Sequence, residues 1–513
     1  MSLPAVRAPF LSAATLLLAA GLYAPLASAQ VSNADLEAMK KQIQEMQQKL
    51  DAMQAAQKAP APAVASTTSA APASAKFDGI QMGPVNLKFG GFLDFTTIYR
   101  NRNEEADVAS SFNAVPFANS SAHNLNEFRE SARHSRLSLL ISGPSDGHQH
   151  AEGYYEMDFL GAAQTANSKE SNSYNIRVRN VYGQYFNDAN GFSMLAGQNW
   201  SLLTQTKTPG IVARSENAPA VLDSQYVPGF NWTRNPQIRF VEKFNKFVTA
   251  GLSFESPQGL FSGKAPTIAG VTPIATLPSG SLYNSANTYT FDGMPDIIAK
   301  VAVDPGYGHY ELFALTRQLK DRLPGTAVTA GQNNTATGNG IGGSVLLSLL
   351  PKQLEVQGSF LTGNGIGRYG SAQLPDATYN AAGGVQALKG TTFLLGLTAH
   401  PTSTIDLYAY YGKEKVDANY TAITGGYVGY GAPNINLSGC SFEGGTCAPN
   451  LGESSQTAIG GTWKYYRGAL GNMQLGLMLT STKVVSLAGL NGLQPDTRMT
   501  TGMLSVRYYP YQN

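Results

Sequence analysis

The chain has 513 residues, and its 36 Lys and Arg against 34 Asp and Glu give a formal net charge of +2. This balance gives no sign of nucleic-acid binding, because the chain has no basic run of the kind that would provide it. Glycine (54), Tyr (25) and Phe (22) are abundant, charged residues make up 14% and there are 2 Cys, a composition typical of an exported, glycine-rich β protein. A soluble β-solenoid would share some of these features.

Residues 1–29 have the pattern of a secretory signal peptide. Arg7 precedes an apolar run from Phe10 to Tyr23, and Ala27–Ala29 supplies small residues for cleavage before Gln30. A transmembrane anchor is the alternative, but the run is shorter than the roughly 20 residues that a spanning helix needs. No later stretch is apolar enough to span as a helix, so a membrane protein with this sequence has to be a barrel.

Residues 30–57 carry a short heptad pattern, with apolar residues in 3-4-3-4-3 spacing at Leu36, Met39, Ile43, Met46, Leu50 and Met53. The pattern predicts a periplasmic coiled-coil helix, and a lone amphipathic helix is the alternative. So short a coil needs tethering to a larger assembly. Residues 58–76 are almost entirely Ala, Pro, Ser and Thr, which indicates a linker.

Residues 77–513 read as one all-β domain. The segment Val85–Arg100 alternates apolar and polar residues, and fifteen similar segments follow, beginning near His134, His150, Tyr174, Phe192, Gln237, Phe247, Pro295, His309, Ile341, Gln353, Thr391, Thr404, Ser455, Asn472 and Asp496. Short connections such as Asp188–Gly191 alternate with long ones such as Thr204–Pro236. This predicts a sixteen-stranded antiparallel transmembrane β-barrel in the outer membrane of a diderm bacterium, with short periplasmic turns and long outer loops.

Aromatic residues near predicted strand ends fit the girdles that such barrels place at the two membrane interfaces; the set is Trp200, Trp463, Tyr465, Tyr508 and Tyr509. Cys440 and Cys447 lie close together in a polar segment, which predicts a disulfide that closes one loop. A metal site is not expected, since only Glu443 is near the cysteines. The six His form no recognisable triad, so we predict no catalytic residue, no cofactor and no enzyme.

In a barrel of this size, selectivity depends on the charges that face the lumen. Alternation, with the flanking loops, gives the cationic candidates Lys88, Arg100, Arg136, Arg177, Arg179, Arg214, Arg239, Arg317 and Arg368, and on the same faces Lys243, Lys300 and Lys464. The acidic candidates are Asp94, Glu152, Glu156, Asp158, Glu255, Asp296, Glu311, Glu355 and Asp406.

Two interpretations of these charges are open. The acids of the third strand (Glu152, Glu156 and Asp158) form salt-bridge ladders with Arg177 and Arg179 of the fourth. The remaining arginines, chiefly Arg100, Arg136, Arg239 and Arg317, line a path for carboxylates, which a guanidinium binds bidentately. The loop Thr204–Pro236 either folds inward as a constriction or packs over a neighbouring subunit. The segment GNGIGRY (363–369) lacks the Lys-Ser or Lys-Thr of a nucleotide-binding loop, so its glycines are predicted to allow a tight passage that aims Arg368.

Several segments together resemble the DcaP-like trimeric outer-membrane porin family: the heptads, KFGGFLDF (88–95), RNVYGQYF (179–186) leading to LAGQNWSLL, GNGIGRY, and the closing VRYYPY (506–511). The resemblance implies a homotrimer in outer-membrane lipid whose N-terminal helices form a periplasmic coiled coil, and passive uptake of dicarboxylates and other small anions. A general non-selective porin is one alternative, and a structural anchor that makes periplasmic or cell-wall contacts through the coiled coil is another. Barrels of this kind commonly end on an aromatic residue, whereas here Gln512 and Asn513 follow Tyr511.

Overall fold

The computed structural model describes residues 41, 44, 48, 79–161, 174–207, 209–278 and 288–511. The chain separates into two units, Met1–Ala73 and Ser74–Asn513. In the first unit Lys41, Gln44 and Gln48 are helical. The signal peptide, the heptad seam and the linker lie outside the described residues and stay predictions. Within the described part, no helix has both the length and the apolar character to cross a membrane.

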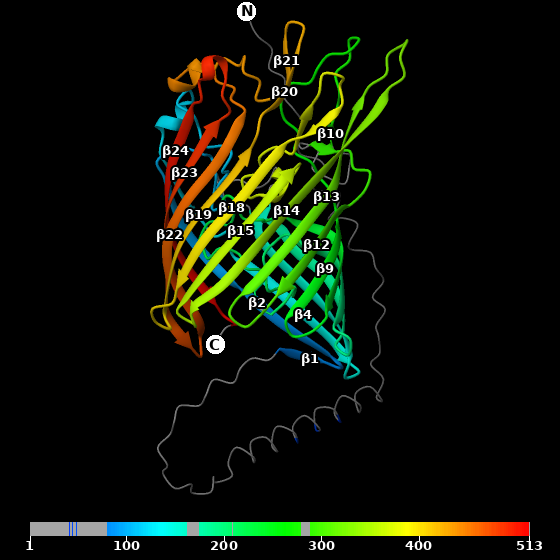
Figure 1. The fold of residues 1–513 in the computed structure, drawn as a ribbon. Helices are drawn as coiled ribbons and strands as arrows, with labels where there is room; N and C mark the ends of the chain where they lie inside the picture. The colour runs from blue at the N-terminus through cyan, green and yellow to red at the C-terminus, as the bar shows by residue number, and fades with distance from the viewer. Residues whose placement is uncertain are drawn as a thin grey trace, which may run out of the picture. The chain divides into compact units, whose positions relative to one another are not determined.

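The second unit is built on a closed antiparallel sheet (Figure 1). Its wall consists of sixteen strands, namely β2 (Val85–Arg100), β4 (Arg136–Ser145), β5 (Gln149–Gly161), β6 (Asn175–Asn187), β7 (Phe192–Trp200), β8 (Arg234–Lys243), β9 (Val248–Glu255), β12 (Asp296–Val303), β13 (His309–Leu323), β14 (Gln332–Leu350), β15 (Leu354–Asn364), β18 (Lys389–Ala399), β19 (Ile405–Val416), β22 (Leu451–Gly468), β23 (Gly471–Ser486) and β24 (Asp496–Tyr509). Each strand pairs with the next, and β24 pairs back with β2 from Leu93↔Tyr508 to Arg100↔Thr501. The sixteen-stranded prediction is confirmed.

The remaining elements are short and either pair with β2 or lie in the loops. β1 (Ile80–Met82) and β3 (Glu127–Ser131) both pair with β2, and three hairpins stand in loops: β10 (Thr276–Pro278) with β11 (Thr288–Thr290), β16 (Ala377–Tyr379) with β17 (Val385–Ala387), and β20 (Asn419–Ile423) with β21 (Gly426–Tyr430). The described residues also form four 3-10 turns, η1 (Ser121–Asn124), η2 (Gly367–Tyr369), η3 (Ser438–Ser441) and η4 (Leu490–Gly492). The hairpins β10–β11 and β20–β21 lie at the end of the barrel that carries the long loops (Figure 1).

The two faces of the wall differ in chemistry because side chains alternate along each strand. On β2, Leu93 and Phe95 are exposed on the outside, whereas Asp94 and Thr96 are buried inside. The same outward exposure of apolar residues continues round the wall at Ile238, Phe254, Val301, Leu312, Ile341, Phe360, Phe393, Leu395, Leu407, Ile459, Leu477, Leu479, Leu504 and Val506. An apolar exterior around a polar interior is what a barrel in a lipid bilayer requires.

One aromatic prediction is wrong. Trp463 and Tyr465 are exposed on the outer face, as a girdle requires, but Trp200 is buried inside the barrel. It packs edge-on against Tyr226 and Phe230, with ring centroids 5.8 and 5.9 Å away. Alternation along β7 puts Trp200 on the face of the exposed Met194, but it is the last residue of the strand, and the loop that follows brings Tyr226 and Phe230 against it inside the barrel.

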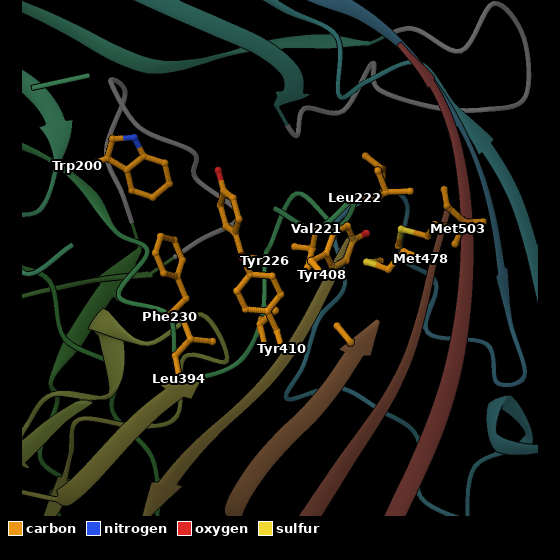
Figure 2. Packing of buried hydrophobic residues seen from close by; sticks show 14 residues of the cluster. Trp200, Val221, Leu222, Tyr226, Phe230, Leu394, Tyr408, Tyr410, Met478 and Met503 are labelled. Atoms are coloured by element: carbon orange, nitrogen blue, oxygen red, sulfur yellow. The ribbon is translucent and has the colours of Figure 1, made fainter. Parts of the chain in front are cut away.

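The hydrophobic core therefore lies inside the barrel, between the wall and segments that fold into the lumen. Figure 2 shows its largest cluster, in which Val221, Leu222, Tyr226 and Phe230 of one loop meet side chains of wall strands, among them Leu394, Tyr408, Tyr410, Met478 and Met503. Burying these apolar groups supplies the free energy that keeps the loop inside.

Candidate functional site: the charged lumen and its loops

The connection between β7 and β8, residues 201–233, enters the barrel and lies across its lumen; we call it the inward loop. It begins three residues earlier than the predicted Thr204–Pro236, and the structure places it inside rather than over a neighbour. Leu203, Val227 and Phe230 are all buried. A segment in this position narrows the passage and brings its own polar groups to the wall.

Glu311 of β13 holds the beginning of the inward loop. Its carboxylate is fully buried and accepts hydrogen bonds from the amide and the hydroxyl of Thr206, at 3.0 and 2.7 Å. Lys300 lies 3.0 Å away as its ionic partner, and the Ser344 hydroxyl (2.5 Å) and His309 Nε2 (3.1 Å) also contact it. One carboxylate thus ties the loop to three wall strands, since Lys300 belongs to β12 and Ser344 to β14.

Further polar contacts tie the inward loop to the rest of the wall. They are the Leu202 amide to Glu255 (2.8 Å), Arg214 to Glu152 (2.5 Å), Gln357 to the Asn217 carbonyl (2.8 Å) and the Ala220 amide to the Tyr410 hydroxyl (3.2 Å). Because these partners come from β9, β5, β15 and β19, the loop is held from opposite sides of the lumen.

A second loop, residues 365–388 between β15 and β18, contains most of the GNGIGRY motif and supports the inward loop. Glu414 of β19 lies between the two loops and accepts hydrogen bonds from the amides of Gly229 (2.7 Å) and Ala372 (2.8 Å). The two loops therefore share one buried carboxylate and form a single network.

Gly412 of β19 allows the inward loop to press against the wall. A Cβ atom at this position would lie 1.8 Å from the backbone oxygen of Pro228, so a side chain requires the loop backbone to move. We predict that Gly412→Ala displaces the loop, costs about 1–3 kcal/mol of stability and raises the single-channel conductance. The control is Gly183→Ala, another strand glycine, where a Cβ meets nothing within 4 Å. Equal conductance in both variants would contradict the prediction.

A third loop, residues 101–126, joins the network at its outer end. Asp223 of the inward loop accepts a hydrogen bond from the Ser110 amide (3.1 Å), and the Ser224 amide donates to the Val108 carbonyl (3.0 Å). Arg100 lies beneath this junction, with Glu104 at 3.3 Å and Glu127 at 3.1 Å.

Glu104 gives this junction a pH dependence. Burial, with the nearby charges of Asp223 and Glu127 and against that of Arg100, raises the pKa of Glu104 from 4.5 to about 8. The folded junction therefore favours the protonated acid. Its contribution to stability is complete below pH 4.5 and is lost as the pH rises towards 8.

We accordingly expect faster amide exchange in residues 104–111 and 220–226 at pH 9 than at pH 6.5, after correction for intrinsic rates. Glu104→Gln, which cannot ionise, should remove most of this difference. Glu105→Gln, on an exposed side chain of the same loop, should leave it in place. A pH difference that persists in the Glu104 variant would show that another group is responsible.

Five arginines gather on one side of the lumen, and we call them the arginine cluster: Arg136, Arg177, Arg179, Arg234 and Arg507. Shared partners connect them. Arg136 and Arg507 both lie over the Phe92 ring, at 5.2 and 4.8 Å from its centroid. Arg179 and Arg234 lie over the Trp200 ring in the same way, at 5.8 and 4.6 Å.

Three carboxylates balance the arginine cluster only in part. Glu156 pairs with Arg179 (2.6 Å) and more distantly with Arg136 (3.7 Å). Asp158 pairs with Arg177 and Arg179, at 2.6 and 3.1 Å, and Asp94 pairs with Arg507. Five guanidinium groups facing three carboxylates leave a surplus of positive charge.

Two nitrogens of the arginine cluster lack a hydrogen-bond acceptor among the described residues, and two of its side chains are partly exposed. Nε of Arg136 and Nη1 of Arg234 are buried and have no hydrogen-bond partner in the described part of the chain. The side chains of Arg136 and Arg177 remain 20% and 27% exposed, so water in the lumen reaches them. Because a guanidinium donates in a planar fork, such groups suit a carboxylate.

These pairs confirm the predicted ladder between the acids of β5 and Arg177 and Arg179 of β6. Glu152 is the exception, because its partner is Arg214 of the inward loop (2.5 Å). Two members of the cluster were not among the sequence candidates. Arg507 was missed although alternation along β24 places it on the same face as Ser505, which is buried. Nothing in the sequence marks Arg234, at the end of a loop, as a member of the cluster.

Five predicted inward-facing cations are buried. Arg100, Arg179, Arg239, Lys300 and Arg317 are 0%, 1%, 3%, 1% and 2% exposed. Arg317 forms ion pairs with Asp296 (3.2 Å) and Asp376 (3.3 Å), and Arg239 donates to the backbone oxygen of Trp200. In this structure Arg100, Arg239 and Arg317 hold the loops in place and do not face the open lumen.

The remaining candidates have varied surroundings. Lys88 and Lys243 are exposed on their strands. Arg368 donates to Asn235 Oδ1 (2.7 Å) and lies 3.7 Å from Asp296, so the GNGIGRY motif fixes it against the wall. Lys464 pairs with Asp406.

Cys440 and Cys447 form the predicted disulfide, which lies beside η3 in the loop between β19 and β22 and has a Cα–Cα distance of 4.7 Å. In the described part of the chain no three His, Cys, Asp or Glu residues are placed to hold a metal ion.

Two cavities adjoin the loop network. A cavity of about 670 Å³ lies among the outer loops, lined by Phe261, Tyr379 and Tyr430 among others. A second, of about 360 Å³, lies between the inward loop and the wall strands β14, β15, β18, β19 and β22. His400 of the β18–β19 turn lines it, which places this cavity towards the end with the short turns.

No family model and no curated protein sequence matches the chain. Among solved structures it is similar to the outer membrane channel DcaP of Acinetobacter baumannii, with a TM-score of 0.56 and 15% identity over 84% of this chain and 99% of that one. An anion-selective porin from Comamonas acidovorans matches with a TM-score of 0.45 and 14% identity over 83% and 99% of the two chains. The chain shares the fold of the A. baumannii channel.

Proposed function

We propose that the chain is an outer-membrane porin of the DcaP-like type, through which small hydrophilic solutes diffuse passively with a preference for anions such as dicarboxylates. A closed barrel with an apolar exterior and a charged interior suits a water-filled passage across a bilayer. The resemblance of the sequence motifs and the shared fold support the same proposal.

The arginine cluster is the observation that carries the anion preference. Its surplus of two positive charges lies in a lumen with low-dielectric walls, which concentrates the field on passing ions. Arginine keeps its charge at any physiological pH and binds a carboxylate with two parallel hydrogen bonds. A dicarboxylate gains this interaction at both ends, whereas a cation is repelled.

The loop network is the second part of the proposal. The inward loop leaves room against the wall in the cavity of about 360 Å³, and the cavity of about 670 Å³ lies among the other outer loops. A solute would pass the loop beside the arginine cluster, where Arg136 and Arg177 are partly exposed. Selection by charge and selection by size would then act at the same level of the lumen.

A homotrimer with a periplasmic coiled coil remains part of the proposal, supported by the heptads and the family resemblance. The mass of the detergent-extracted protein tests the trimer. Deleting Gln30–Ala75 separates the pore from the helix: we expect the barrel to insert and conduct as before. Loss of conductance in an inserted barrel would favour the structural-anchor alternative.

The decisive measurement is single-channel recording in a planar bilayer with a KCl gradient across it. We expect a reversal potential that reports chloride as the more permeant ion, and conduction of succinate when it replaces chloride. A clear preference for potassium would overturn the proposed anion selectivity. An equal permeability of both ions would identify a general porin instead.

A further inference from the structure

The cavity of about 360 Å³ under the inward loop, which we call the inner cavity, lies on the wall opposite the arginine cluster. β15, which contributes Glu355 to the inner cavity, is eight strands from β5 in either direction round the barrel. Its volume falls within the lower range of small-molecule sites. The proposed function as an anion channel makes no use of it.

Most of the charge around the inner cavity is already paired. Asp406 accepts from His400 Nδ1 at 2.7 Å and also forms an ion pair with Lys464. These three groups satisfy one another, so they offer little to a ligand beyond the second nitrogen of the imidazole.

Two ionic side chains in the inner cavity lack such a partner. Lys207 of the inward loop and Glu355 of β15 both line it, and neither has an ion pair or a side-chain hydrogen bond in the described part of the chain. They have opposite signs. A solute that carries one ammonium and one carboxylate would give each of them a partner, whereas a simple anion or cation would satisfy only one.

Two tyrosines add an apolar and aromatic surface to this polar pair. Tyr408 and Tyr410 project inward from β19 into the inner cavity, with ring centroids 6.0 Å apart. The Tyr410 hydroxyl is engaged by the Ala220 amide (3.2 Å) and Thr398 (3.2 Å), which fixes the ring in place. A ring held in this way beside a carboxylate attracts an ammonium group through its π face.

We propose that the inner cavity is a binding site for zwitterionic amino acids, in which Glu355 and the tyrosine rings receive the ammonium group and Lys207 receives a carboxylate. The site deepens the proposed function, because it would make a subset of small carboxylates, those with an amino group, preferred solutes of the channel.

The test uses aspartate and succinate, which both have two carboxylates and differ by one ammonium group. Each is added to the channel while the chloride current is recorded, and the concentration for half-maximal block is measured. In the unaltered protein we expect aspartate to block at a lower concentration than succinate. Glu355→Gln should raise the value for aspartate roughly five-fold and leave that for succinate unchanged.

Two further variants make the result specific. Lys207→Gln should weaken block by both solutes, since each offers a carboxylate. Glu130→Gln, which makes the same change of charge on an exposed residue of β3, should alter neither. If Glu355→Gln leaves aspartate block unchanged, or shifts both solutes equally, the binding site is refuted while the anion channel stands. If neither solute enters and potassium is preferred, the proposed function itself fails.

Discussion

Replacing Arg136 and Arg177 together by Gln should abolish most of the preference for anions. The double variant lowers the arginine cluster from five cations to three, equal to the number of its carboxylates, Asp94, Glu156 and Asp158. The net charge of the cluster then falls to zero, so the cluster no longer attracts anions or repels cations. We expect the ratio of chloride to potassium permeability to fall several-fold, towards unity, in a bilayer recording at low salt.

The change should be mild for the fold. Glu156 and Asp158 both keep Arg179, at 2.6 and 3.1 Å, so no buried carboxylate is left without a cation. The control is Arg129→Gln with Arg322→Gln, which removes two positive charges from β3 and from the end of β13, outside the arginine cluster. Its effect should be small and should disappear at high salt, because exposed charges are screened. An unchanged permeability ratio in the cluster variant would show that selectivity arises elsewhere.

Replacing Glu311 by Ala should release the inward loop and raise conductance more than any other single change. The loop would lose both hydrogen bonds from Thr206, and Lys300 would be left buried without its carboxylate. Removing one member of a buried ion pair typically costs about 3–5 kcal/mol. We expect larger and noisier single-channel currents together with a lower temperature for heat-induced unfolding on a gel.

A second variant separates the loop from the stability of the barrel. Adding Lys300→Met removes the uncompensated charge, so the unfolding temperature should recover towards that of the unaltered protein. The loop still lacks its anchor, and conductance should stay high. Glu443→Ala, which removes an exposed carboxylate that accepts from Asn124 (3.0 Å), should change neither quantity. Unaltered conductance in both Glu311 variants would mean that the inward loop does not limit the flow of ions.

The sixteen wall strands were predictable from the sequence because the signal for each strand lies within its own residues. Val85–Arg100 alternates apolar and polar residues, and the same period of two recurs in every wall strand of the structure. The disulfide was predictable for a similar reason, since Cys440 and Cys447 are seven residues apart and lie in one loop.

The interior was much less predictable, because its contacts join residues that are far apart in the chain. Alternation placed Arg317 on the inner face correctly. Nothing near it in sequence shows that Asp376, from a loop 59 residues later, covers it. The prediction for Trp200 was wrong for the same reason. Its partners Tyr226 and Phe230 lie inside the barrel only because their loop folds into the lumen. Inner and outer faces follow from local alternation, whereas open and covered positions depend on the folded loops.

The pairing of β24 with β2 has a consequence for how the protein is made. β2, near the start of the barrel sequence, pairs with β4 on one side, and its partner on the other side is the last wall strand in the chain. Until Asp496–Tyr509 is available, β2 and β23 both present unpaired backbone groups, which no lipid environment tolerates. Asp94 on β2 likewise lacks its partners Ser505 and Arg507 until β24 has formed. Pairing of β24 with β2 therefore makes insertion depend on a full-length chain. A chain that lacks its final strand has two unpaired strand edges and cannot form a closed barrel in the membrane.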